Sequence, residues 1–460
     1  MAYTLHKTKF LFTVLLYLAS AFILLLPAFY NGYPLVTPDT GAYVDSGWYF
    51  HMPLDRPITY SIFVRIASGS GISLWGVVLW QTLILVYFLQ RISRKVLGDR
   101  YRHNLFLAII LLLSGFTSAG WTTSHVMPDI FTAILLLAVA DFFLSPPAEI
   151  KVRILYFLFL FSIIQFHNSN LLLMLVFCIL AGGYAFFGRK KGYAKKIGFL
   201  FGATVCSFVS LSLFNLWQGN GFRPSASTHL FLISRMAENG ILDKFLGQYC
   251  PTEHYELCKV QGNTGERQWD FMWSDKGFLH DKASWHQMEH EYNQIVFRSV
   301  TRPQYLAMQL YESIEGTIRQ IPQCTVNTFA QGKGTTPYIA IEKHLSQEIK
   351  EYRNSLQQLN QLQGQMIYVN GIIFIFLIVL MAYTLFCWPA ILKQPGFRNG
   401  YFFLLLALSG IFINAWVTAT FSTVIDRLQA RVFWLLPFAG ILFLVKQYLL
   451  RKNPVETLRE

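Results

Sequence analysis

The stretch IYVNGIIFIFLIVLMAYTLFCW, residues 367–388, contains no charged side chain. A second uncharged stretch, FLFTVLLYLASAFILLLPAFY, occupies residues 10–30. At about 1.5 Å per residue, an α-helix over either stretch crosses a hydrocarbon core about 30 Å thick. Each stretch therefore predicts a membrane-spanning helix, and together they favour an all-α polytopic membrane protein.

The composition of the whole chain agrees with this fold class. Of the 460 residues, 53% are hydrophobic and only 14% are charged, whereas soluble chains average about 25% charged residues. A single soluble domain, a disordered chain and a fibrous repeat are thereby excluded. Apolar runs bounded by polar or basic residues predict about ten spans, at 10–30, 73–90, 104–120, 129–145, 154–166, 171–188, 197–217, 365–392, 401–420 and 432–450.

The distribution of basic residues predicts the topology. If the amino terminus is cytoplasmic, the inner segments hold 20 of the 38 Lys and Arg, whereas the short outer loops hold only Arg56, Arg65, Arg427 and Arg431. Basic residues near helix ends resist translocation, so we expect a multi-pass protein with both termini cytoplasmic. The compact inner loops and the lack of eukaryotic retention signals favour the bacterial cytoplasmic (inner) membrane. The net charge of +13 then belongs to the inner rim. No basic patch remains for a nucleic-acid partner.

The predicted spans divide the chain into three parts. Residues 1–217 form an amino-terminal membrane domain whose first outer loop is 31–72, and residues 365–460 form the carboxy-terminal membrane helices. Between them, 218–364 is polar, with 14 basic and 15 acidic residues, and is expected to form a mainly helical external (periplasmic) domain. Cys250 and Cys258 lie eight residues apart in it, so an oxidising compartment would favour a disulfide, the alternative being two free thiols.

Five acids outside the long loop lie at the outer face: Asp39, Asp45, Asp55, Asp129 and Asp426. Asp39 lies in a Pro- and Gly-containing turn, and in the helix expected next it shares one side with Tyr43. Partial burial would raise the pKa of this carboxyl and favour its use as a general base. The alternative is that Asp39 caps the helix. Asp45 is a second candidate, or a surface acid.

Two further outer turns carry candidate residues. Asp129 follows Pro128 at the start of a predicted helix, where a carboxylate also complements the helix dipole. His125 lies four residues earlier, and the pair has the side-chain types that orient a proton acceptor or bind a divalent cation, although two residues do not define a metal site. The turn His167–Asn170 is polar enough to line a cavity, and a simple turn explains it equally well.

The last outer loop contributes Arg427 and Arg431. A guanidinium offers forked donors and stays charged, which suits the phosphate of a lipid-linked substrate. The alternative is anchoring at lipid headgroups. Tyr43 and Arg56 are further candidates for substrate binding, although Arg56 follows Asp55 and a local ion pair is the simpler expectation.

Three motifs together resemble the GT-C superfamily of integral-membrane glycosyltransferases, which includes dolichyl-phosphate-mannose protein mannosyltransferases and bacterial aminoarabinose transferases. The motifs are Pro38-Asp39-Thr-Gly-Ala-Tyr43, Met127-Pro-Asp129, and the segment from Arg427 to Pro437. The resemblance implies that Asp39 is the acidic residue at the catalytic centre and that Asp129 is the second acidic residue of the outer loops. It also implies that Arg427 or Arg431 is the basic residue near the last outer loop. It also implies helices lying along the membrane near 57–68.

The same resemblance implies inverting transfer from a polyprenyl-phosphate sugar to a lipid, glycan or protein acceptor. This chain has Asp-Thr where many members have Asp-Glu, and a second Asp follows at position 45, so either Asp39 or Asp45 could be the base. The long insertion has no counterpart in that pattern, and we expect it to choose the acceptor.

Three other functions remain open from the sequence. An O-antigen ligase or polymerase would place its chemistry on long-loop residues such as Arg223, His229, His286 or His290. A transporter of lipid-linked glycans would place ionisable residues at mid-membrane, and no predicted span has a carboxylate near its centre. An assembly subunit would use the external domain for binding and tolerate loss of the outer acids.

Overall fold

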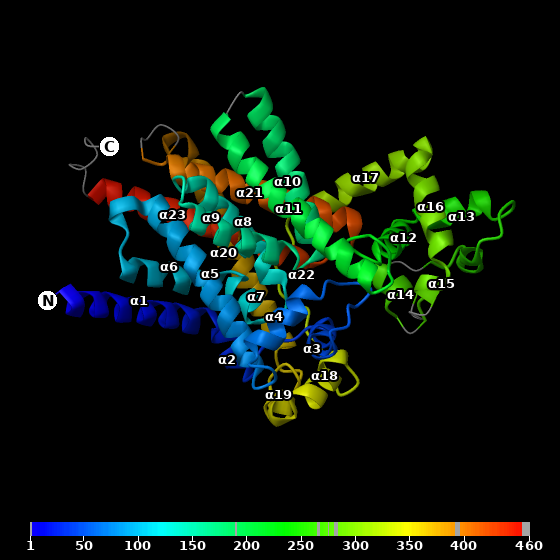
Figure 1. Ribbon diagram of the computed structural model, residues 1–460, viewed down its shortest axis with the longest axis horizontal. Coiled ribbons are helices and arrows are strands. Elements are labelled where there is room, and N and C mark those ends of the chain that lie inside the picture. Colours follow the sequence, from blue (N-terminus) through cyan, green and yellow to red (C-terminus); the bar gives the residue numbers. More distant parts are fainter. Residues whose placement is uncertain are drawn as a thin grey trace.

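The computed structural model describes residues 2–188, 191–264, 267–274, 276–279, 284–391 and 396–452. Within these ranges the chain is helical, and its only β-type pairing is one isolated bridge between Leu35 and His125 (Figure 1). The predicted all-α fold is therefore confirmed for the described part of the chain.

The amino-terminal half alternates long apolar helices with short helices at the turns. Ser73, for example, caps the first long helix after the first outer loop by accepting a hydrogen bond from the backbone N–H of Trp75. The elements are α1 (Ala2–Leu24), α2 (Leu26–Asn31), α3 (Thr40–Tyr49), α4 (Thr59–Ala67), α5 (Leu74–Leu97), η1 (Gly98–Arg100), α6 (His103–Phe116), α7 (Ala119–Ser124), α8 (Asp129–Leu144), α9 (Ile150–Ile164), α10 (Asn168–Phe187) and α11 (Lys191–Trp217).

The long insertion and the carboxy-terminal helices follow. Prolines in the first turns of α17 and α18 suit helix starts, because the missing N–H would have no partner there. The elements are α12 (Thr228–Glu238), α13 (Ile241–Tyr249), η2 (Glu256–Val260), α14 (Gln268–Met272), α15 (Ser284–Gln287), α16 (Glu289–Thr301), α17 (Pro303–Gln320), α18 (Thr336–His344), η3 (Ser346–Glu348), α19 (Ile349–Asn354), α20 (Gln363–Ile391), α21 (Arg398–Phe421), α22 (Asp426–Phe433) and α23 (Leu435–Lys452).

Each predicted span contains a helix, but the predicted number of about ten spans is not confirmed. Among the described residues, six helices are long and apolar enough to cross a membrane: 74–100, 168–187, 192–217, 363–383, 398–421 and 426–452. The run at 10–30 is divided between α1 and α2, and the run at 104–120 between α6 and α7. Residue 392 of the eighth predicted span and the predicted inner segment beyond residue 452 lie outside the described residues.

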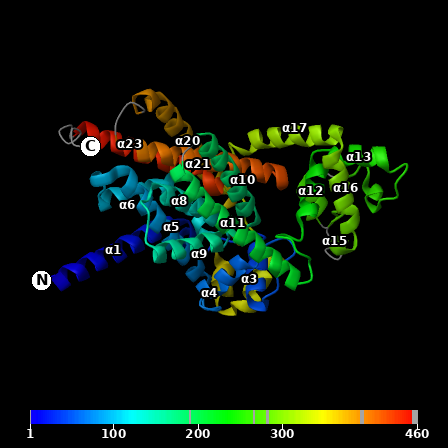
Figure 2. The same ribbon diagram turned by 45° about the horizontal axis from the view of Figure 1, so that its top comes forward.

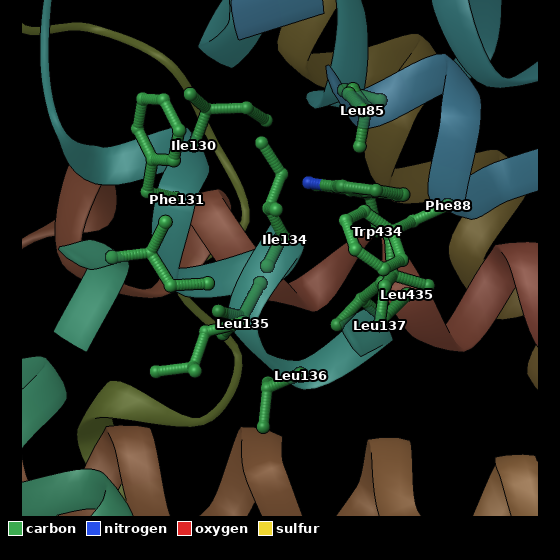
Figure 3. Close-up of a cluster of buried hydrophobic side chains, with 14 of the residues drawn as sticks. Leu85, Phe88, Ile130, Phe131, Ile134, Leu135, Leu136, Leu137, Trp434 and Leu435 are labelled. Atoms are coloured by element: carbon green, nitrogen blue, oxygen red, sulfur yellow. The ribbon is translucent and has the colours of Figure 1, made fainter. Parts of the chain in front are cut away.

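Helix α8 explains part of the difference, because it is surrounded by protein. Every residue from Asp129 to Asp141 is buried, as expected of a helix that is hydrophobic all round. Figure 3 shows its leucine and isoleucine side chains beside Leu85 and Phe88 of α5 and Trp434 at the end of α22. A helix inside the bundle does not need the length of a lipid-facing span.

The molecule has two distinct ends. The start of α1 and the end of α23 lie together at one end, and helices α12–α16 lie at the opposite end (Figures 1 and 2). The outer loops that carry the candidate residues lie between these ends, on the side of α12–α16. This arrangement is compatible with both ends of the described chain facing the same compartment.

The insertion divides into two packing units. Residues of α12–α17 form a hydrophobic cluster of their own around Phe245 and Trp285, beside the bonded sulfurs of Cys250 and Cys258. Helices α18 and α19 instead join the core of the membrane part. A Cβ on Gly41 would lie 2.2 Å from the carbonyl carbon of Thr336, so only glycine permits the close approach of α3 and α18.

A candidate ionic site at one end of the bundle

Four charged side chains, from three segments far apart in the chain, form a continuous ionic chain. Asp39 precedes α3, Asp129 begins α8, and Arg427 and Arg431 belong to α22. Arg427 Nη2 lies 2.8 Å from Asp39 Oδ2, and its Nε lies 3.7 Å from Asp129 Oδ2. Arg431 Nη1 lies 3.0 Å from the other oxygen of Asp129. Residues almost 400 positions apart thus meet, and Arg427 links the two candidate aspartates.

The Asp39 side chain contributes to this ionic chain rather than to a helix cap. It occupies the N-cap position of α3 but makes no side-chain cap hydrogen bond. Instead it also pairs with Arg56 at 3.2 Å. Burial raises the pKa of Asp39, but Arg56 and Arg427 outweigh burial and hold this pKa well below its usual value. The raised pKa predicted from the sequence is therefore wrong for this arrangement, because two guanidiniums stabilise the carboxylate.

Arg431 is buried too deeply to anchor the protein at lipid headgroups. Its side chain is 0% exposed, and its Nη2 donates hydrogen bonds to Ser169 Oγ and Asn414 Oδ1, both at 2.8 Å. With Asp129 these groups satisfy both ends of the guanidinium. Arg427, in contrast, has a side chain that is 20% exposed, so it is the more accessible of the two arginines.

A small cavity opens beside the Arg427–Asp129 contact. Its lining includes His125, Asp129 and Arg427 together with the coil segment 325–328. Within the described chain, Arg427 Nε and Asp129 Oδ2 are buried atoms without a hydrogen-bond partner. The free volume of about 20 Å³ is room for about one water molecule. Any ligand larger than a few atoms requires this cavity to widen.

The two candidate histidines lie near the ionic chain, and burial keeps both of them neutral. His125 Nδ1 donates to the Trp121 carbonyl at 2.8 Å, and burial lowers the pKa of His125 to about 4. His167 caps α10 by accepting from the backbone N–H of Ser169, the residue that Arg431 contacts. Burial, with Arg431 nearby, lowers the pKa of His167 to about 3. Neither imidazole carries charge at neutral pH.

Of the remaining candidates near Asp39, two lie at the site and one does not. Arg56 places its guanidinium 5.2 Å from the centre of the Tyr43 ring and pairs with Asp55 at 2.5 Å, so it links the expected local ion pair to Asp39. Asp45 points elsewhere, since its carboxylate lies 2.8 Å from His344 Nε2 on α18. The geometry thus favours Asp39 over Asp45 as the residue that acts with the arginines.

The residues of the long insertion that an O-antigen ligase would use lie together, apart from the ionic chain. Arg223 forms a two-pronged ion pair with Glu289, His286 Nδ1 lies 3.9 Å from the same carboxylate, and His229 is buried nearby against Tyr292. His290 is exposed. Arg223 is therefore neutralised locally.

Several site residues were not singled out from the sequence. Asn414 on α21 contacts Arg431, and the wall 325–328 belongs to a coil without any periodic pattern. Asn414 had a usable signal, because an amide inside an apolar span needs a polar partner. The coil segment offered none.

A divalent cation has no ready set of ligands at this site. Among the described residues, no three His, Cys, Asp or Glu side chains gather as a metal site requires. Asp39 and Asp129 already share Arg427. Asp141, at the far end of α8, is likewise paired, with Arg91 at 2.9 Å and Lys95 at 2.5 Å.

Comparison with known proteins adds no relative: no family model, curated protein or solved structure matches the chain. The fold and the site themselves define a class. The protein is an α-helical chain with several helices fit to cross a membrane and a buried ionic site at one end of its bundle.

Proposed function

We propose that the protein is an integral-membrane glycosyltransferase. It moves a sugar from a polyprenyl-phosphate donor to a lipid, glycan or protein acceptor at the outer face of the bacterial cytoplasmic membrane. The observation that carries the proposal is the bridge that Arg427 makes between Asp39 and Asp129 beside a cavity. The bridge supports the proposal because transfer from a lipid phosphate needs a carboxylate that can accept a proton and, beside it, a guanidinium that can bind the phosphate.

Arg427 is the proposed phosphate ligand. Its side chain is partly exposed and lines the cavity, and its Nε has no hydrogen-bond partner among the described residues. Arg431 has a different role, because Asp129, Ser169 and Asn414 already engage it. It is a positioning residue that holds Asp129, and Asp129 in turn orients Arg427.

Asp39 is the proposed base. The acceptor oxygen forms a bond to the anomeric carbon while the bond from that carbon to the phosphate oxygen breaks, with inversion. The acceptor proton passes to the Asp39 carboxylate, and the lipid phosphate departs with the bonding electron pair, its charge stabilised by Arg427. The donor needs no divalent cation in this scheme, and a cation between the two aspartates would have to displace Arg427.

Binding of the donor would also change the basicity of Asp39. In the resting arrangement two guanidiniums keep the pKa of Asp39 low, which makes it a weak proton acceptor. When the donor phosphate takes Arg427, Asp39 retains only Arg56, so its pKa rises. The segment 325–328 must move for the sugar to enter, because the cavity in the resting arrangement is too small for it.

The test is to replace Asp39, Asp129 and Asp45 singly by Asn in a host whose surface glycans can be profiled. We expect Asp39→Asn to reduce transfer about 10²–10⁴-fold and to accumulate a polyprenyl-phosphate sugar. Asp45→Asn is the matched control, since Asp45 pairs with His344 away from the site, and it is expected to retain transfer. Membrane abundance and thermal stability of each variant distinguish lost chemistry from lost folding.

The opposite pattern would refute the assignment. If Asp39→Asn and Asp129→Asn leave every glycan unchanged while alanine at Arg223 or His286 abolishes one, the chemistry lies in the external helices. That result would favour the ligase function. Unchanged glycans in all variants, with loss only on deletion of α12–α16, would instead indicate a binding role.

A further inference from the structure

Helix α17, within the insertion that the sequence predicts to be external, has an inverted polarity in its carboxy-terminal half. The side that faces protein consists of Ser313, Gly316, Thr317 and Gln320, all of them buried. The opposite side exposes Ile314 and Ile318, at 63% and 64%. A helix in water buries its apolar side and exposes its polar side, so this half of α17 is arranged for an apolar surrounding.

The exposed apolar side continues along the helix. Leu310 and Tyr311 are also exposed, and with a period of 3.6 residues they fall on the same face as Ile314 and Ile318. Leu306, which is 39% exposed, lies at the edge of this face. Scattered apolar side chains on a surface are normal, but a contiguous stripe marks contact with another apolar body. The stripe, from Leu310 to Ile318, covers about 12 Å of helix at 1.5 Å per residue.

The depth of this half of α17 follows from its packing on α21. Ser313 Oγ lies 2.7 Å from Thr420 Oγ1, and a Cβ on Gly316 would lie 3.3 Å from the Cβ of Ala419. Thr420 and Ala419 are in the last turn of a helix that is long and apolar enough to span a membrane. Ile314 and Ile318 therefore lie level with the outer end of a membrane span, and small residues at the contact are typical of helix packing in lipid.

Figures 1 and 2 both show α17 beside the outer part of α21 and continuing beyond it toward α12–α16. The amino-terminal half of α17 therefore lies away from the span, near α12–α16, and the carboxy-terminal half packs on the span. Phe412 on α21 is exposed as well. Helix α17 therefore exposes the same kind of apolar side chain as its neighbour α21.

We propose that the carboxy-terminal half of α17, residues 313–320, lies in the outer leaflet of the membrane, with Ile314 and Ile318 against lipid chains. The occupant of this surface is lipid rather than a second copy of the chain. Arg319 and Glu315 flank the stripe as a pair 3.7 Å apart, and the long arginine side chain reaches the headgroup level. This inference is independent of the proposed catalytic activity.

The test uses spin labels on the full-length protein in lipid nanodiscs. Single cysteines replace Ile314, Ile318 and Leu306 in a background that carries Cys206→Ser, because Cys206 is an exposed native thiol. Phe412→Cys on α21 is the matched lipid control. Glu342→Cys, an exposed position on α18, is the water control. The measurement compares the collision rates of each label with molecular oxygen and with a water-soluble nickel chelate.

We expect labels at Ile314 and Ile318 to match the Phe412 control, with oxygen access at least several-fold above nickel access. Leu306 precedes Ile314 by 8 residues and Ile318 by 12, on the side of α12–α16, so its label is expected to be more accessible to nickel. Nickel access at Ile314 and Ile318 equal to that at Glu342 would place the stripe in water and overturn the proposal. Low access for both reagents would overturn it too, by showing that protein covers the stripe.

Discussion

Lowering the pH from 7 to 5 is expected to destabilise the protein through His125 and His167. Burial holds the pKa of His125 at about 4 and that of His167 at about 3, against an ordinary value of 6.5. The unfolded chain therefore binds protons that the folded chain does not. Their stabilising effect is complete above pH 6.5 and is lost as the pH falls toward the folded-state pKa.

The magnitude follows from 1.36 kcal/mol per pH unit for one proton. Between pH 7 and 5 each histidine loses about 2 kcal/mol, because at pH 5 its imidazole is almost fully charged in the unfolded chain and still neutral in the fold. The two together amount to about 4 kcal/mol, a large part of the 5–15 kcal/mol that typically stabilises a folded protein.

His125→Asn isolates one half of this effect. The amide N–H₂ of Asn can replace the Nδ1–H that donates to the Trp121 carbonyl, but it does not titrate. The matched control is His51→Asn, since His51 is exposed. The assay follows tryptophan fluorescence during thermal unfolding in detergent at pH 7, 6 and 5.

We expect the fall in unfolding midpoint from pH 7 to 5 to be about half as large in His125→Asn as in the parent protein, and unchanged in His51→Asn. If all three proteins lose the same number of degrees, His125 is not a buried neutral group in the fold. That result would refute the buried position of the His125 ring and its hydrogen bond to the Trp121 carbonyl.

Two further predictions concern close packing and the buried ion pair. Gly41→Ala is expected to lower stability by about 1–3 kcal/mol, because its Cβ would overlap the Thr336 backbone. The control is Gly182→Ala, which has open space around it and is expected to lower stability little or not at all. Thermal unfolding compares the two variants. Arg431→Met is expected to cost about 3–5 kcal/mol by leaving Asp129 without its buried partner. The double variant with Asp129→Asn is then expected to cost less than the sum of the single changes, and additive costs would contradict a direct pair.

The meeting of Asp39, Asp129 and the α22 arginines was accessible from the sequence through topology. Once the inner rim is assigned by its Lys and Arg, the remaining outer loops are confined to one membrane face, and their few charges have few other partners available. The helical fold was accessible for a similar reason, because long uncharged runs admit no other spanning structure in a single chain of this composition.

The number of membrane spans could not be predicted from the sequence, because hydropathy does not distinguish a helix surrounded by lipid from a helix surrounded by protein. Residues Asp129 to Asp141 are as apolar as a lipid-facing helix, but they lie inside protein. Residues 313–320 of α17 have the opposite arrangement: their buried side is polar, which lowers the hydropathy of the segment. The low pKa of Asp39 was also missed, since burial alone gives the opposite sign and the distance to Arg56 and Arg427 cannot be read from the chain.

The charges of the ionic site cancel, and this bears on how it would bind a phosphate. Asp39, Asp55 and Asp129 oppose Arg56, Arg427 and Arg431. A site without net charge attracts no anion over distance. Under the proposed function the donor lies in the same bilayer, which gives it a high effective concentration, as for a tethered ligand. Its phosphate would then need only to replace Asp39 at Arg427, and the same exchange would free Asp39 to act as a base. Asp39→Asn removes the competitor for Arg427, so we expect a lower KM for the donor together with a lower kcat. A raised KM would contradict the exchange even if transfer were lost.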